Sequence, residues 1–133
     1  MLRNMCKGKI HRATVTEARI DYVGSITIDS LLMKAANIAP HEMVQITSLR
    51  NATRWITYVI PAPEHSGKIC LNGPPALLFQ PGDLVIVLST GLFNEQEVAS
   101  LMPTVVYVDE SNRIEKIETL DLTVARQDME LES

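Results

Sequence analysis

Short segments of strand-forming residues, broken by turns roughly every 10–15 residues, limit most strongly what this chain can fold into. Val, Ile, Thr and aromatic residues dominate these segments, and Gly, Pro, Asn and Asp separate them. The pattern predicts strands over 9–16, 25–28, 43–48, 54–60, 68–71, 84–88 and 104–108, and short helices over 31–36, 74–79 and 92–101. We expect Pro61 and Pro63 to end the fourth strand. Many short strands with few helices predict one compact β-barrel.

The composition agrees with a single packed domain over residues 1–133. Of the chain, 46% is hydrophobic and 21% is charged, which favours a buried core over disorder. The net charge is −4, with no basic cluster, so we expect no nucleic-acid partner. No apolar run reaches the ~18 residues of a membrane span, and none near Met1 resembles a signal peptide, which predicts a cytoplasmic protein.

Cysteines and the tail complete this outline. Cys6 and Cys70 fit neither CxxC nor zinc spacing, so we expect two buried thiols and no metal site. The tail from about residue 118 is charged and poorly periodic. We expect its end to be disordered.

The dipeptide Gly24-Ser25 lies between strand-forming residues. A serine behind a glycine suits an N→O acyl shift, in which the hydroxyl attacks the preceding carbonyl and turns the amide into an ester. Elimination and hydrolysis would then leave a pyruvoyl group, a ketone that forms imines with amines. Gly-Ser by itself is most often only a turn, so the dipeptide alone leaves both interpretations open.

Five motifs in chain order carry a resemblance to a known family. They are Gly8–Thr16, Tyr22–Asp29, Arg54–Ile60, Leu71–Gly73 and Pro81–Ile86. Each motif is weak alone. Together they closely resemble the pyruvoyl-dependent L-aspartate 1-decarboxylases, over roughly residues 1–115.

The resemblance implies a mainly β protein, a double-psi β-barrel with a few short helices, assembled as a homotetramer with active sites between subunits. It implies a zymogen that cuts itself at Gly24-Ser25 into a β chain, residues 1–24, and an α chain, residues 25–133. The lyase would then hold L-aspartate as a Schiff base on the pyruvoyl cofactor made from Ser25. It would release β-alanine and CO2 for pantothenate and coenzyme A biosynthesis.

The resemblance also implies roles for individual residues. Tyr58 would be the proton donor to the α-carbon after CO2 leaves, and Lys9 and His11 would line the substrate site. Arg54 would bind a substrate carboxylate, because a guanidinium can do so in bidentate fashion. Arg54 and Tyr58 are four residues apart and would share one face of an extended strand.

Thr57 resembles a residue used in self-processing, where its hydroxyl would stabilise the oxyanion formed as Ser25 attacks Gly24. It would also contact substrate. In a regular strand Thr57 points away from Tyr58. Either the strand is irregular there, or the two residues serve neighbouring sites across a subunit interface.

One further segment would contact the substrate or the carbonyl groups at the cleavage site. It consists of Asn72, Gly73, Pro74 and Pro75. The two prolines stand where small residues are usual in the family, and proline offers no N–H donor. Val23 replaces a usual acidic residue beside the scissile bond. The prolines predict weaker substrate binding, and Val23 predicts slower self-processing.

Two alternatives to an aspartate decarboxylase stay open. One is a pyruvoyl-dependent decarboxylase of a different small or carrier-linked amino acid. The other is an uncleaved, non-catalytic barrel subunit.

Overall fold

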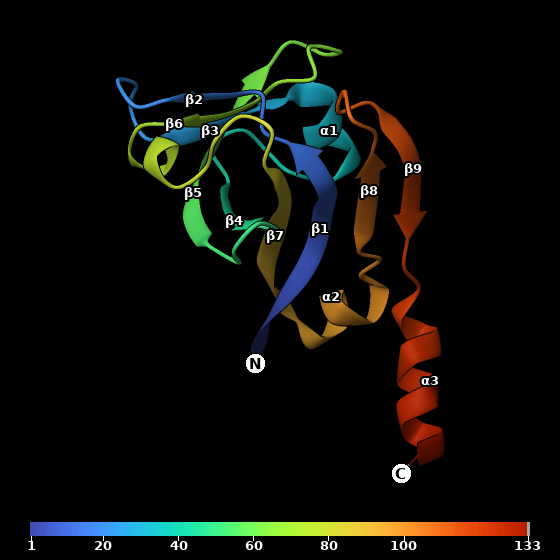
Figure 1. The fold of residues 1–133 in the computed structure, drawn as a ribbon. Coiled ribbons are helices and arrows are strands. Elements are labelled where there is room, and N and C mark those ends of the chain that lie inside the picture. Colours follow the sequence, from blue (N-terminus) through green and yellow to red (C-terminus); the bar gives the residue numbers. More distant parts are fainter. Residues whose placement is uncertain (133) are drawn as a thin grey trace.

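The structure, a computed structural model, describes residues 1–132 (Figure 1). Its strands are β1 (Leu2–Thr14), β2 (Glu17–Arg19), β3 (Ser25–Asp29), β4 (Met43–Ser48), β5 (Arg54–Ala62), β6 (Ile69–Asn72), β7 (Leu84–Asn94), β8 (Thr104–Val108) and β9 (Ile114–Thr119). The helices are α1 (Ser30–Ala35), the 3-10 turn η1 (Pro74–Leu77), α2 (Glu95–Ser100) and α3 (Leu122–Glu132). Within the described residues the strands form one nine-stranded sheet, in the order β2-β6-β3-β5-β4-β7-β1-β8-β9. The expected mainly β class with short helices is confirmed.

The sheet is strongly curled, because only Val15 and Thr16 separate β1 from β2. Five strands stand between β2 and β1 in the sheet order. In a flat sheet that would place β1 and β2 about 29 Å apart, at about 4.8 Å per strand spacing. The connection from the end of β1 to the start of β2 spans at most about 11 Å. The β2 edge must therefore lie beside the end of β1.

Hydrogen bonds of the two linking residues hold this arrangement. The Thr16 N–H donates to the carbonyl of Ile69 at 2.8 Å, and the Ile69 N–H donates to Thr16 Oγ1 at 3.0 Å. Val15 donates to the carbonyl of Asp83 at 2.9 Å and accepts from the N–H of Gly82 at 2.8 Å. The link thus connects to β6 on one side and to the turn before β7 on the other.

The core fills the inside of the curled sheet. Alternate residues of the strands are buried there, with Leu32 and Met33 of α1 and with Phe79. Asp29 starts α1 by accepting from the Leu31 N–H at 2.9 Å, and its other oxygen accepts from the Gly67 N–H at 2.9 Å. None of the described helices has the length and apolar character needed to cross a membrane.

Several expected boundaries were wrong. β5 runs through Pro61 to Ala62, since Pro61 lies opposite Ile28 of β3 and proline is tolerated where its missing N–H is not required. The helix expected over 92–101 is confined to α2, because residues 92–94 extend β7 against the start of β1. Asn94 and Glu97 then form a capping box that begins α2. The helix expected over 74–79 is the short turn η1.

Two strands, β2 and β9, were not expected. The three residues of β2 are too few for a visible alternation, and β9 is exposed along most of its length. Strand β9 reaches into the tail that we expected to be disordered, and α3 follows it. Helix α3 projects away from the sheet (Figure 1), and most of its described side chains are exposed. An isolated helix of this length is marginal in water, so disorder of the last residues stays a prediction.

Gly8 tests the packing of β1 against α1. A Cβ atom added to Gly8 would lie 1.7 Å from the carbonyl oxygen of Ala36, a backbone atom that cannot move alone. We expect Gly8→Ala to lower the free energy of unfolding by at least about 2 kcal/mol, measured by urea denaturation. Gly91→Ala is the matched control, because its Cβ would meet only side-chain atoms, of Phe93 at 3.1 Å and of Lys7 at 3.6 Å. Equal losses in both variants would contradict this account.

Candidate active site

The Gly24-Ser25 bond lies where a loop crosses the end of a strand. β2 runs parallel to β6 and β3 runs antiparallel to it, so residues 20–24 must pass over the end of β6 at Asn72. Arg19 and Ser25, on either side of that loop, are both in register with Asn72. The curled sheet therefore places the Gly24-Ser25 dipeptide directly over Asn72 and Gly73.

Gly73 is in very close contact with Gly24. Its φ of 76° and ψ of −142° belong to a region that side-chain-bearing residues rarely adopt. A Cβ atom on Gly73 would lie 2.8 Å from Gly24 Cα and 2.9 Å from the carbonyl oxygen of Tyr22. The Gly73 N–H donates to the carbonyl of Arg19 at 2.8 Å. Only glycine at this position lets the loop lie so close to β6.

The Asn72 amide joins Ser25 to two further polar side chains. Its Nδ2 donates to Ser25 Oγ and to Thr27 Oγ1, each at 2.9 Å, and its Oδ1 accepts from the Cys70 thiol at 3.2 Å. Ser25 is fully buried and Asn72 is 4% exposed. The Ser25 hydroxyl in turn lies 3.4 Å from the carbonyl oxygen of Val23. A buried serine is thus held by an N–H donor, one residue after the carbonyl that it would attack.

An open pocket of about 400 Å³ lies beside this cluster. Its lining consists of Asp21, Tyr22, Val23, Ser25, Thr27, Ile60 and Asn72. Arg19 lies over the Tyr22 ring at 5.0 Å from its centroid, so a positive charge flanks the loop. Ser25 contributes to the wall of this pocket but is itself fully buried.

β5 lies beside β3, and the parallel ladder between them begins at Ile26 and Val59. Ser25 and Tyr58 each precede these residues by one, so they lie on the same face of neighbouring strands. The Tyr58 ring packs against His41, with the ring centroids 5.1 Å apart. β5 pairs with β4 from Arg54 to Tyr58 without a register shift, so Arg54 and Tyr58 share one face.

Thr57 lies on the opposite face of β5 and is 7% exposed. Of the two alternatives for Thr57, an irregular strand does not hold, since the ladder with β4 is unbroken there. Within one chain, Thr57 therefore points away from the face that carries Ser25 and Tyr58. The alternative that stays open is that Thr57 and Tyr58 serve two neighbouring sites across a subunit interface.

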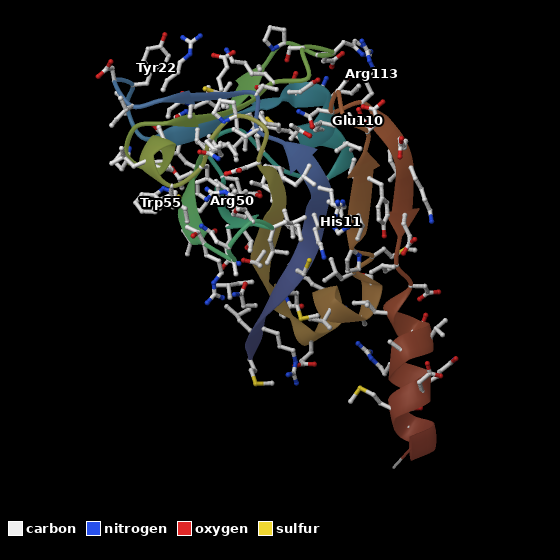
Figure 2. All side chains as sticks on the ribbon, in the orientation of Figure 1. His11, Tyr22, Arg50, Trp55, Glu110 and Arg113 are labelled. Carbon is white, nitrogen blue, oxygen red and sulfur yellow. The ribbon has the colours of Figure 1, made fainter. Side chains whose placement is uncertain are left out.

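Lys9 and His11 are not brought to Ser25 within one chain. Both lie on β1, and β5, β4 and β7 stand between β1 and β3 in the sheet. Figure 2 shows His11 well apart from Tyr22, which lines the pocket at Ser25. The His11 ring packs edge-on against Tyr107 at 5.5 Å, and burial, followed by the charges of Lys9 and Arg12, lowers the pKa of His11. His11 is therefore neutral at pH 7.

Pro74 and Pro75 open η1, a position where an N–H would have no helical partner. Pro74 Cδ would lie 3.6 Å from a Cβ on Gly24, so the first proline flanks the scissile bond. Val23 beside it is 80% exposed. The prolines fit the fold, and what they remove is two N–H donors near Ser25.

Sequence reasoning missed Thr27 and Cys70. Thr27 lies two residues after Ser25 on β3, and Cys70 lies two residues before Asn72 on β6. Because alternate residues of a strand share a face, each lies on the same face as an expected site residue. That spacing was the available signal, but it becomes informative only when β3 and β6 are known to be neighbours.

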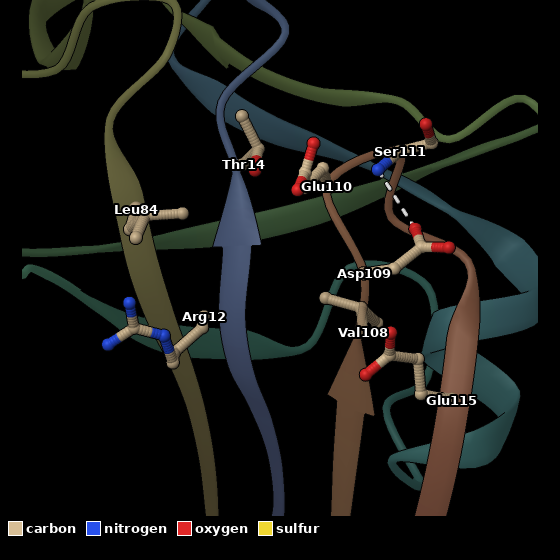
Figure 3. Close-up of a pocket in the computed structure, with 8 residues that line it drawn as sticks. All are labelled: Arg12, Thr14, Leu84, Val108, Asp109, Glu110, Ser111 and Glu115. Atoms are coloured by element: carbon tan, nitrogen blue, oxygen red, sulfur yellow. Dashed lines mark hydrogen bonds between the residues drawn. The ribbon is translucent and has the colours of Figure 1, made fainter.

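A larger pocket, of about 530 Å³, lies elsewhere, between the end of β1 and the β8–β9 turn (Figure 3). Its lining includes Arg12, Asp109, Glu110 and Glu115, and none of the expected site residues. In the part of the chain that the structure describes, no group of three or more His, Cys, Asp or Glu side chains is placed to hold a metal ion.

Comparison with known proteins adds independent information. The model of the family described as aspartate decarboxylase matches residues 1–115. An aspartate 1-decarboxylase of Acetivibrio thermocellus is 52% identical over 119 residues, which cover 90% of this chain and 94% of that protein. One of Heliobacterium modesticaldum is 53% identical over 114 residues, 86% of each chain, and one of Listeria monocytogenes is 51% identical over 117 residues, 88% and 92%.

Gly73 allows the site geometry to be tested without any assay of function. We expect Gly73→Ala to lower the free energy of unfolding by about 3 kcal/mol, because it combines backbone strain with a clash against the loop. Gly82→Ala is the control, since Gly82 also has a positive φ, of 93°, but its Cβ would meet nothing within 4 Å. The difference between the two, measured by urea denaturation, reports the contact with Gly24. A Gly73→Ala loss no greater than that of Gly82→Ala would show that the contact is unimportant.

Proposed function

Because the chain belongs to the aspartate decarboxylase family, we propose that it cuts itself at Gly24-Ser25 and decarboxylates L-aspartate to β-alanine with the pyruvoyl group so formed. The family makes this chain a carboxy-lyase that acts as an aspartate 1-decarboxylase. The observation that carries the self-cleavage is the buried Ser25 hydroxyl, held by Asn72 beneath the loop that bears Gly24.

The residues around Ser25 suit the formation of a pyruvoyl group. Attack of Ser25 Oγ on the Gly24 carbonyl carbon forms a C–O bond and breaks the C–N bond, which leaves an ester and a free amine. Asn72 Nδ2 lies 2.9 Å from Ser25 Oγ and can stabilise negative charge on this oxygen. Gly73 and Pro74 keep the loop against β6, so the reacting groups are held together before the reaction begins.

The same face of the sheet supports the proposed decarboxylation. The pyruvoyl group supplies an electron sink for the charge that the departing CO2 leaves on the α-carbon. Tyr58, on the same face of the strand beside Ser25, is proposed to hold a proton for that carbon. Arg54, on the same strand face, offers a guanidinium to a substrate carboxylate. Thr57 is proposed for self-processing and substrate contact from a neighbouring site, because it faces away.

We propose that a second copy of the chain completes the site. Three strands separate β1, which carries Lys9 and His11, from the Ser25 strand, yet the positive charge of Lys9 and the imidazole of His11 suit a carboxylate ligand. We therefore propose a homotetramer in which Lys9 and His11 of one copy complete the site at Ser25 of another. The two-residue link between β1 and β2 supports closure of the curled sheet into the double-psi β-barrel that we propose for each copy.

Substrate choice has one specific alternative. Pro74 and Pro75 remove two backbone donors beside position 25, together with their hydrogen bonds to a substrate. This favours, as a second candidate, a decarboxylase of another small or carrier-linked amino acid. Release of CO2 from such an amino acid, with L-aspartate untouched by the cleaved protein, would decide for this alternative.

Ser25→Ala tests self-cleavage directly. Intact-mass analysis of the wild-type protein is expected to show fragments that correspond to residues 1–24 and 25–133, whereas Ser25→Ala stays at full length because it has no hydroxyl to attack Gly24. The variant should also produce no β-alanine from L-aspartate. A wild-type chain that stays at full length after prolonged incubation would identify an uncleaved, non-catalytic subunit instead.

Co-expression of two inactive variants tests the shared site. Ser25→Ala and Lys9→Ala chains should each form an inactive homotetramer. A mixed assembly contains sites that combine an intact Ser25 from one copy with an intact Lys9 from another. Random mixing is expected to restore about a quarter of the wild-type activity per site. If co-expression restores nothing, while both variants assemble normally by size-exclusion chromatography, then Lys9 and Ser25 act within one chain. A Lys9→Ala homotetramer that is active by itself would show that Lys9 is not required.

A further inference from the structure

We propose that Cys70 is a positioning residue, which holds the Asn72 amide with its NH2 group toward Ser25 and thereby sets the rate of self-cleavage. This inference rests on the proposed self-cleavage and adds a residue that acts through Asn72. The Cys70 thiol donates to Asn72 Oδ1 at 3.2 Å, and Cys70 is 1% exposed. Cys70 pairs with Thr27 and precedes Asn72 by two residues on the same face of β6.

The orientation of the Asn72 amide matters for the chemistry. With NH2 toward Ser25, the serine oxygen accepts a hydrogen bond, and its negative charge is stabilised as the hydroxyl gives up its proton. In the flipped amide, Oδ1 would face the serine oxygen and repel that charge. The hydroxyl would then donate its proton to an oxygen that is not a base. Only the first orientation assists the attack on Gly24.

The other partners of the amide do not fix this orientation. The hydroxyls of Ser25 and Thr27 can either accept from an NH2 group or donate to a carbonyl, so they suit both orientations. Cys70 favours one, because its S–H donates to Oδ1 while its sulfur is a weak acceptor for an N–H. The thiol is therefore the group at this site that distinguishes the two ends of the amide.

The environment keeps this thiol protonated. Burial, and after it the negative charge of Glu17, raises the pKa of Cys70 above its ordinary value, against smaller opposing effects of Lys68 and Arg19. A thiolate at this position would have no proton to donate and would repel Oδ1. The neutral thiol is the form that the proposed role needs.

The test compares rates of self-cleavage of freshly purified full-length protein by intact mass. Cys70→Ala and Cys70→Val remove the donor, and Val also fills the space, so loss of packing is separated from loss of the hydrogen bond. We expect both to slow cleavage about tenfold. Cys70→Ser replaces the thiol with a hydroxyl that can donate to Oδ1 but can also accept from an NH2 group, so we expect it to cleave faster than Cys70→Val and more slowly than the wild type. Cys6→Ala, at the exposed cysteine on β1, is the matched control and should cleave normally.

A double-mutant cycle shows whether Cys70 acts through Asn72. Asn72→Ala should slow cleavage by itself, and adding Cys70→Val should then have no further effect, since no amide remains to be oriented. Additive effects would overturn the proposal, as would wild-type cleavage rates in Cys70→Val, or a Cys70→Ser rate as slow as that of Cys70→Val. Failure of the wild-type chain to cleave would instead refute the proposed function. Thermal unfolding of each precursor confirms that the compared variants are folded.

Discussion

The two-residue link between β1 and β2 is the constraint on which the rest of the structure depends. Val15 and Thr16 cannot span a flat sheet, so the sheet must curl and bring β2 against the side of β6 that β3 leaves free. Residues 20–24 then have to cross the end of β6. The contact between Gly24 and Gly73 follows from that crossing, and so does the position of Ser25 over Asn72. A short connection at the opposite end of β6 thus determines the surroundings of the Gly24-Ser25 bond.

Local sequence patterns predicted those parts of the fold that local forces determine. The strand over 43–48 has the expected bounds, because its alternation and its flanking turns agree. Boundaries failed where pairing overrides propensity: Pro61 stays in β5 because β3 lies beside it, and residues 92–94 are extended because the start of β1 pairs with them. The strand pairing of β2 is with β6, over three residues, which are too few for its own sequence to contain a strand signal.

The site could be predicted from sequence as a set of residues, but not as an arrangement. Ser25, Tyr58 and Asn72 come together because β5, β3 and β6 are neighbours, which no local pattern reveals. Lys9 and His11 belong to a distant strand, and a single sequence cannot show whether two residues meet within one chain or between copies. Cys70 looked like an inert buried thiol until the register of β6 placed it beside the Asn72 amide.

The position of β1 has a consequence for the life of the protein after cleavage. β1 pairs with β7 along most of its length and with β8 on its other side, yet it lies before Gly24, whereas both partners lie after Ser25. Cutting that bond would leave a central strand on a separate peptide, held only by hydrogen bonds and packing. Folding of the uncut precursor is unimolecular. Folding of the cut protein would be bimolecular, because the chain connection no longer supplies a high effective concentration of one peptide near the other. Such a protein folds once, before it is cut, and its later persistence depends on slow unfolding.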